Sequence, residues 1–114
     1  MAISEFEIFK TDKLAAKFCS DRSAHFPPDQ LKICYKIEDQ DLYITEVRPR
    51  WNKPDETTEM MVAKAKFIKS KGIWKLYWQR QNMKWVVYEP MESSSELSEL
   101  LDEIGKDPHG CFWG

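Results

Sequence analysis

Residues 73–88, with the sequence IWKLYWQRQNMKWVVY, constrain the fold more than any other stretch of this chain. They contain three of the five tryptophans and divide into two runs rich in β-favouring residues, 73–80 and 84–88, around a polar link. This pattern predicts a β-hairpin, which needs further strands beside it and a covering layer on one face. Because 114 residues is the length of one domain, we expect residues 1–114 to form a single domain around that hairpin.

Three strands are predicted before the hairpin. Residues 31–38 alternate apolar and polar side chains, and residues 42–47 follow after a short polar turn as an antiparallel partner. Residues 60–70 form the third strand, although their alanines, methionines and lysines also favour a helix. The short turn that leads from this segment into the hairpin favours the strand. Residues 48–56, RPRWNKPDE, contain two prolines, and we expect a loop there.

Helices are predicted towards both ends of the chain. Ser4 and Glu7 form a capping box at the start of a helix that runs to about residue 22. The apolar stripe of this helix consists of Ile8, Thr11, Leu14, Ala15, Phe18 and Cys19. A second helix follows the serines at 93–95 and ends at Gly105. The predicted fold class is therefore α+β: helix, five-stranded antiparallel β-meander, helix, with both helices on one face of the sheet.

The composition is that of a protein of the cytoplasm. Charged residues make up 32% of the chain, no apolar run is long enough to span a bilayer, and the first ten residues lack a basic-then-apolar leader. The three cysteines, Cys19, Cys34 and Cys111, are odd in number and widely spaced, which is typical of reduced thiols. We therefore expect a cytoplasmic protein with no membrane segment.

The aromatic content predicts a surface for another protein. With five tryptophans, six phenylalanines and four tyrosines, the chain has more rings than two short helices on one sheet face are expected to cover. Uncovered apolar patches usually mark interfaces, and two copies of one patch can meet across a two-fold axis. The function we expect first is thus a homodimeric protein-interaction module without enzymatic activity. Its candidate interface is Tyr43, Ile73, Tyr77, Phe112 and Trp113, unless the last two residues dock on their own chain.

The distribution of charge supports a second hypothesis, the binding of single-stranded nucleic acid. The net charge is −3 over residues 1–47, +7 over 48–84 and −6 over 85–114. Lysines alternate with core residues on the predicted strands, so they share the sheet face that the helices leave open. The candidate surface consists of Lys32, Lys36, Lys64, Lys66, Lys75 and Tyr77, with Arg48, Arg50, Trp51 and Lys53 at its rim. Lysines neutralise phosphates and rings stack on bases, but lysines also keep an exposed strand soluble.

Arg48, Arg50 and Trp51 together predict a fixed corner of the structure. The planar guanidinium of an arginine can pair with a carboxylate in two parallel hydrogen bonds while it stacks on an indole ring. The C-terminal third of the chain is acidic and offers carboxylates for this pairing. The candidate partners are Glu89, Glu92 and Glu96.

No set of residues in the sequence predicts a cofactor or a catalytic centre. A remote alternative is a metal-dependent nuclease, because an acidic strand beside an arginine could hold magnesium and a phosphate. The residues concerned are Glu38, Asp41, Glu46 and Arg48. A zinc site would have to combine His109 and Cys111 with distant ligands, and zinc ligands normally come in closely spaced pairs. Those distant ligands are Cys19, Cys34 and His25, so we predict no metal site.

Several blocks of the sequence resemble a known family. They are EVRPRW at 46–51, WKLYWQR and KWVVYEP within 74–90, and DPHGCFWG at 107–114, with SEFE at 4–7 as a weaker match. In this order they resemble small bacterial proteins that are grouped as domain of unknown function number 3024. The resemblance implies a free-standing bacterial protein of one domain, often carried on mobile DNA such as integron cassettes, and it implies no particular chemistry.

Overall fold

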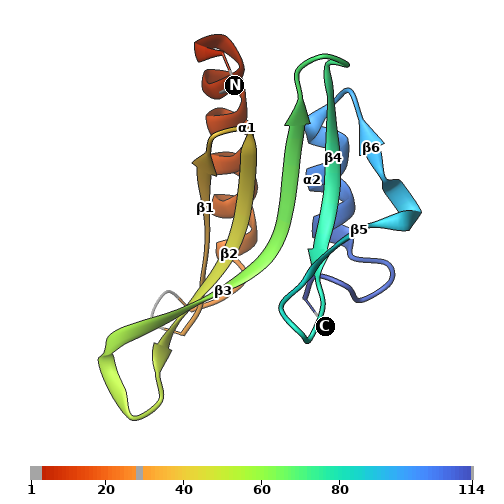
Figure 1. Ribbon diagram of the computed structural model, residues 1–114. Coiled ribbons are helices and arrows are strands. Elements are labelled where there is room, and N and C mark those ends of the chain that lie inside the picture. The colour runs from red at the N-terminus through yellow and green to blue at the C-terminus, as the bar shows by residue number, and fades with distance from the viewer. Residues whose placement is uncertain (1–3, 28–29, 114) are drawn as a thin grey trace.

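The computed structural model describes residues 4–27 and 30–113, apart from the side chain of residue 54. The elements in chain order are α1 (Glu5–Ser23), β1 (Lys32–Glu38), β2 (Asp41–Arg50), β3 (Lys53–Ile68), β4 (Ile73–Gln79), β5 (Trp85–Val87), η1 (Glu89–Met91), β6 (Ser93–Ser94) and α2 (Leu97–Lys106). The strands β1 to β5 form an antiparallel meander in that order, and the short β6 pairs with β4. Both helices lie behind this sheet (Figure 1), so the predicted α+β class and the strand at β3 are confirmed.

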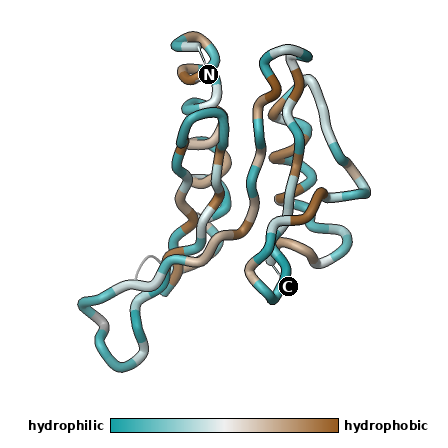
Figure 2. The backbone as a smooth tube through the Cα atoms, in the orientation of Figure 1, coloured by the Kyte–Doolittle hydropathy of each residue, from teal (hydrophilic) through white to brown (hydrophobic). Residues whose placement is uncertain are grey.

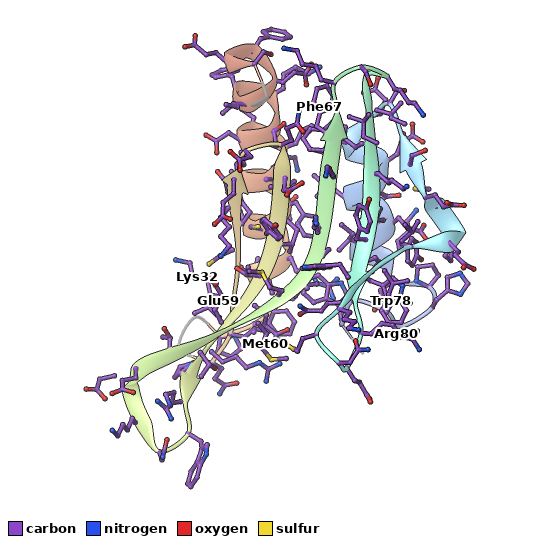
Figure 3. The ribbon with its side chains drawn as sticks, viewed as in Figure 1. Lys32, Glu59, Met60, Phe67, Trp78 and Arg80 are labelled. Atoms are coloured by element: carbon purple, nitrogen blue, oxygen red, sulfur yellow. The ribbon has the colours of Figure 1, made fainter. Side chains whose placement is uncertain are left out.

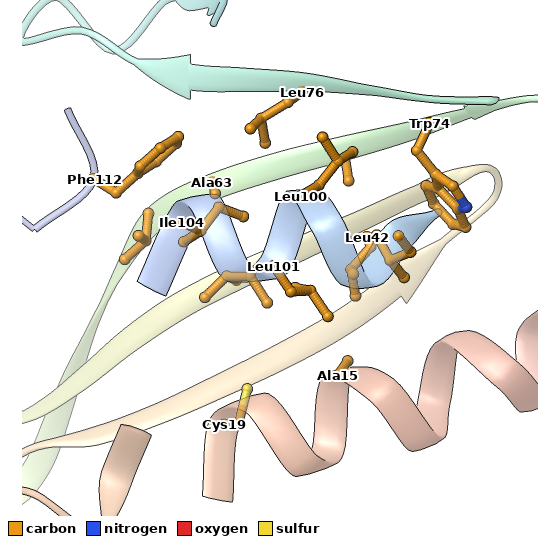
Figure 4. Packing of buried hydrophobic residues seen from close by; sticks show 14 of the residues in the cluster. Ala15, Cys19, Leu42, Ala63, Trp74, Leu76, Leu100, Leu101, Ile104 and Phe112 are labelled. Carbon is orange, nitrogen blue, oxygen red and sulfur yellow. The ribbon is translucent and has the colours of Figure 1, made fainter. Parts of the chain in front are cut away.

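One hydrophobic core lies between the helices and the sheet. The strands contribute Ile33, Leu42, Ile44, Ala63, Ala65, Phe67, Trp74 and Leu76 to it. Ala63 and Ala65 lie at the centre of the sheet, where their small side chains leave room for the larger residues of α2. Figure 4 shows Leu100, Leu101 and Ile104 of α2 filling the space in front of these strands. All three are buried, so this side of α2 packs against the sheet.

Helix α1 begins as the sequence predicts but extends past the sheet. The backbone N–H of Glu7 donates to the Ser4 hydroxyl at 3.3 Å, which confirms the cap. Thr11 and Ala15 are buried, one on each successive turn. Ile8 is in phase with them but is 37% exposed, so its predicted burial was wrong. The reason is visible in Figure 1, where the first turns of α1 rise above the turn that joins β1 to β2.

The loop predicted at residues 48–56 is instead the end of a long hairpin. Strands β2 and β3 stay paired as far as Arg50 and Lys53, with Pro49 opposite Thr57. A proline in a sheet is tolerated where its missing N–H would face solvent. This condition holds at Pro49 because β1 ends its pairing with β2 at Val47. The hairpin therefore projects beyond the rest of the sheet, and its residues are mostly hydrophilic (Figures 1 and 2).

A bulge in β3 changes which residues share a face. Ile44 pairs with Ala63 and Thr45 pairs with Met61, so Val62 has no partner of its own on β2. An extra residue of this kind bends the strand and increases its local twist. Val62 is buried rather than exposed beside the lysines, and Met61 lies on the opposite side of the sheet from Ala63. Simple alternation along residues 60–70, which predicts Met61 on the side of Ala63 and Val62 on the side of the lysines, is therefore wrong for these two residues.

The C-terminal segment docks on its own chain, which is one of the two arrangements expected from the sequence. The carboxylate of Asp107 accepts hydrogen bonds from the backbone N–H groups of Cys111, Phe112 and Trp113 at 2.8–3.2 Å. The Trp113 indole N–H donates to the Ile104 carbonyl at 2.7 Å. Phe112 is buried, and Trp113 is half-buried. These two aromatic residues thus pack on the core of their own chain.

Neither helix in the described part of the chain has the length and apolar character that a membrane crossing requires.

Candidate functional site

The sheet face that points away from the helices carries a row of alternating lysine and tyrosine side chains. Lys36 on β1 pairs with Tyr43 on β2, Tyr43 with Lys64 on β3, and Lys64 with Tyr77 on β4. We call these four residues the lysine-tyrosine row. Adjacent strands lie about 4.8 Å apart, so the row crosses the sheet over about 14 Å. All four side chains are half-buried, which means that each presents part of its surface to solvent.

The charged and aromatic groups of the row contact one another. The Lys36 amino group lies 5.9 Å from the centre of the Tyr43 ring, and the Lys64 amino group lies 5.1 Å from that of Tyr77. Trp85, from β5, joins them: its ring centre is 6.0 Å from that of Tyr43 and 5.8 Å from the Lys64 amino group. Ammonium groups at such distances are attracted to the face of a ring. The row and Trp85 therefore form one connected cluster.

A second row, beside the first, divides the face into an acidic and a basic half. Glu38 pairs with Asp41, Asp41 with Lys66, and Lys66 with Lys75. The carboxylates therefore lie on β1 and β2, and the amino groups on β3 and β4. The Tyr43 hydroxyl donates to Asp41 at 3.4 Å, and burial, together with this carboxylate, raises the pKa of Tyr43. An anion approaching this face is repelled at the β1–β2 turn and attracted over β3 and β4.

The lysines of the face differ in their partners. The Lys36 amino group is 3.5 Å from the Glu59 carboxylate and 3.9 Å from that of Glu38. Among the residues that the structure describes, no carboxylate lies within 4.0 Å of the amino groups of Lys64, Lys66 or Lys75, so these three can pair with another anion. Lys32 is exposed at the outer edge of β1, apart from them (Figure 3).

The residues predicted at the rim lie on the projecting hairpin instead. Arg48 forms an ion pair with Glu46, Arg50 pairs with Glu56 at 3.0 Å, and Lys53 lies 3.9 Å from Glu56. The predicted clasp between the two arginines and the acidic C-terminal third is therefore wrong, since their carboxylates come from the same hairpin. Trp51 is at its tip and 94% exposed. None of these residues is part of the lysine-tyrosine row.

The structure also separates the five residues predicted as an aromatic interface. Tyr43 and Tyr77 belong to the row, and Ile73 is half-buried at the end of the β3–β4 hairpin, opposite Ile68. Phe112 and Trp113 lie with the helices, where the Arg22 guanidinium is 4.2 Å from the Trp113 ring. They are thus excluded from an interface on the open face. The pattern of the sequence does not single out Trp85, although its pairing with Gln79, two residues from Tyr77, puts it on the same face.

The acidic residues considered for a nuclease are not gathered into a site. Glu38 and Asp41 face each other at the β1–β2 turn, whereas Glu46 pairs with the buried Ile33 and so lies towards the helices. No group of three or more His, Cys, Asp or Glu side chains within residues 4–27 and 30–113 is arranged to hold a metal ion. The cysteines are free thiols, and burial raises the pKa of Cys19 to about 12.

Comparison with known proteins identifies the family. The family model described as "Domain of unknown function (DUF3024)" matches residues 3–114, so the chain belongs to that family and the resemblance in its sequence blocks is confirmed. No curated protein and no solved structure matches the chain.

Proposed function

We propose that this member of the DUF3024 family binds single-stranded nucleic acid on the open face of its sheet. The observation that supports the proposal is the lysine-tyrosine row together with Trp85. A single strand offers phosphates, which pair with lysines, and unstacked bases, which stack on aromatic rings. Both kinds of group alternate here across four strands, with Lys64, Lys66 and Lys75 free of carboxylate partners within the described part of the chain.

A single strand suits this face better than a duplex does. The bases of a duplex are stacked on one another and present only their edges, whereas those of a single strand can turn towards a protein surface. Tyr43, Tyr77 and Trp85 are all half-buried, so each side chain presents part of its surface to a base. Stacking on such rings tolerates any base, so we expect little sequence preference.

A homodimer through the same face is the weaker candidate. The patch predicted from the sequence loses Phe112 to the core and Trp113 to the helix side of the molecule. A two-fold axis that crosses the strands along the row would place Lys64 against the Lys64 of a second copy. Burying like charges against one another is costly, because the desolvated charges lack partners. The lysine-tyrosine row is therefore better suited to binding a polyanion than to packing against the same row of a second copy.

The experiment that tests the proposal is a titration of fluorescent single-stranded DNA and RNA oligonucleotides at several salt concentrations. We expect affinity that falls steeply with salt, with a slope of about 0.7 for each phosphate neutralised. Lys64→Gln should reduce that slope by the contribution of one phosphate, about 0.7. Tyr77→Ala should weaken binding by about 1–3 kcal/mol at every salt concentration, because one stacking platform is lost.

Matched variants on the helix side serve as controls. Lys13→Gln and Phe9→Ala remove a charge and an exposed ring from α1, at the opposite face of the molecule. They should leave affinity and slope unchanged. Absence of binding at low salt, or equal losses in the row variants and in these controls, would contradict the proposal.

A further inference from the structure

We propose that the projecting part of the β2–β3 hairpin pairs with the same segment of a second copy of the chain. This segment, which we call the arm, comprises residues 48–61. Its backbone is open on both sides: the pairing of β1 with β2 ends at Val47, and that of β4 with β3 begins at Ala63. In the described part of the chain, no further strand lies beside the arm. An open strand edge presents unpaired N–H and C=O groups that can template another strand.

The apolar side chains of the arm are exposed at both of its ends. Trp51 at the tip is 94% exposed, and Met60 at the base is 63% exposed. Figure 3 shows Met60 where the arm leaves the sheet, and Trp78 and Arg80 where β4 ends. Two arms that run antiparallel across a two-fold axis bring the tip of each to the base of the other. That arrangement covers apolar groups that the single chain leaves in water.

Charge determines which antiparallel register two copies of β3 can adopt. A two-fold axis at Glu56 would place two Glu56 carboxylates opposite each other, and an axis at Thr57 would pair Asp55 with Glu59. Like charges directly opposite destabilise a sheet. An axis at Thr58 avoids both conflicts, because Glu56 then faces Met60 and Thr57 faces Glu59. An axis beyond Thr58 would bring Asp55 to Ala63 or further, where β4 already occupies the edge of β3. Thr58 is therefore the residue at which the two arms meet.

This register also gives Trp51 a place to bind. With Thr58 at the axis, Lys53 lies opposite the partner's Ala63, which neighbours Trp78 on β4, so the tip of each arm reaches the partner's β4 near its C-terminal end, where the β4–β5 turn begins. That turn has an open hollow of about 490 Å³, lined by Trp78, Arg80, Gln81 and Asn82. The Arg80 guanidinium already lies 5.9 Å from the Trp78 ring, and a second indole can stack on its free side. The open sheet face with the lysine-tyrosine row stays uncovered, so the arm pairing is independent of nucleic-acid binding.

Cross-linking tests the register. In a chain with Cys34→Ser and Cys111→Ser, a Thr58→Cys substitution places one thiol of each copy at the two-fold axis. We expect mild oxidation to give a covalent dimer of twice 13.5 kDa. Ser70→Cys is the control, because this residue is equally exposed but lies in the β3–β4 turn, away from the arm. A Thr58→Cys variant that cross-links no more than the Ser70→Cys variant would overturn the register.

Light scattering over a dilution series tests the dimer itself. We expect a mass that falls from two copies to one copy of 13.5 kDa on dilution. Trp51→Ala should raise the dissociation constant about tenfold or more, whereas Phe9→Ala, which removes another exposed ring, should not change it. A mass of one copy at the highest concentration, or equal effects of the two substitutions, would overturn the proposal. Neither variant changes the row, so loss of the dimer and loss of nucleic-acid binding are separate outcomes.

Discussion

At the scale of single residues, Asp107 organises the C-terminal segment. Its backbone is left-handed, with φ of 41°, and its carboxylate accepts three backbone hydrogen bonds. Asp107→Ala removes both acceptor oxygens and with them all three hydrogen bonds, and we expect it to lower the free energy of unfolding by about 2–3 kcal/mol. Asp107→Asn should cost less, since asparagine tolerates this conformation and keeps one acceptor oxygen. Urea unfolding of the two variants measures both effects, and an alanine variant as stable as the wild type would contradict them.

The same segment shows what the sequence could and could not predict about single residues. The apolar character of Phe112 and Trp113 predicted that they would be covered, but it left an interface with a second copy and docking on their own chain as alternatives. The role of Asp107 was not predictable, because an acidic residue after a helix is also ordinary for a solvated turn. Only the left-handed backbone at Asp107 directs the carboxylate towards the N–H groups that follow it. The hydrogen bond from the Arg22 guanidinium to the Gly105 carbonyl, at 2.8 Å, was not predictable either, because it depends on how the ends of two distant helices pack.

At the scale of elements, α1 shows that the helical spacing of apolar residues does not by itself predict which of them are buried. Phe9 is 62% exposed on the part of α1 that extends past the sheet, whereas Leu100 is fully buried on α2. We expect Phe9→Ala to change the free energy of unfolding by no more than about 0.5 kcal/mol. Leu100→Ala should lower it by about 2–5 kcal/mol, because it leaves a cavity in the core. Chemical denaturation distinguishes these values, and a costly Phe9→Ala would show that the first turns of α1 are covered.

The strands were predictable in type and order but not in length or register. Alternation along the chain identifies β1 and β4, and it correctly assigned Lys64 and Tyr77 to the open face. The local rule that proline ends a strand failed at Pro49, because the edge of β2 is free at that point. The bulge at Val62 and the approach of Trp85 to Tyr43 are decided by cross-strand packing. Neither feature can be predicted from the residues of its own strand alone.

At the scale of the whole molecule, the tyrosines couple stability to high pH. Burial and the Glu103 carboxylate, which accepts from the Tyr88 hydroxyl at 2.6 Å, raise the pKa of Tyr88. The hydrogen bond to Asp12, followed by burial, raises the pKa of Tyr35 to about 12. The folded protein thus keeps both hydroxyl groups protonated. Tyr88 is buried near β4, and Tyr35 lies on β1 at the opposite edge of the sheet.

Because an unfolded tyrosine has a pKa of about 10, the unfolded chain loses protons above that pH while the folded chain retains them. These two residues therefore contribute stability that is fully present below about pH 10 and is lost as the pH rises towards 12. We expect the free energy of unfolding, measured in urea between pH 8 and pH 11, to begin to fall at about pH 9 because of the buried Cys19 thiol and to fall more steeply above about pH 10. Tyr88→Phe should make that fall shallower, whatever its effect at pH 8. An equal fall in the variant and the wild type would mean that Tyr88 ionises in the folded protein as readily as in the unfolded chain.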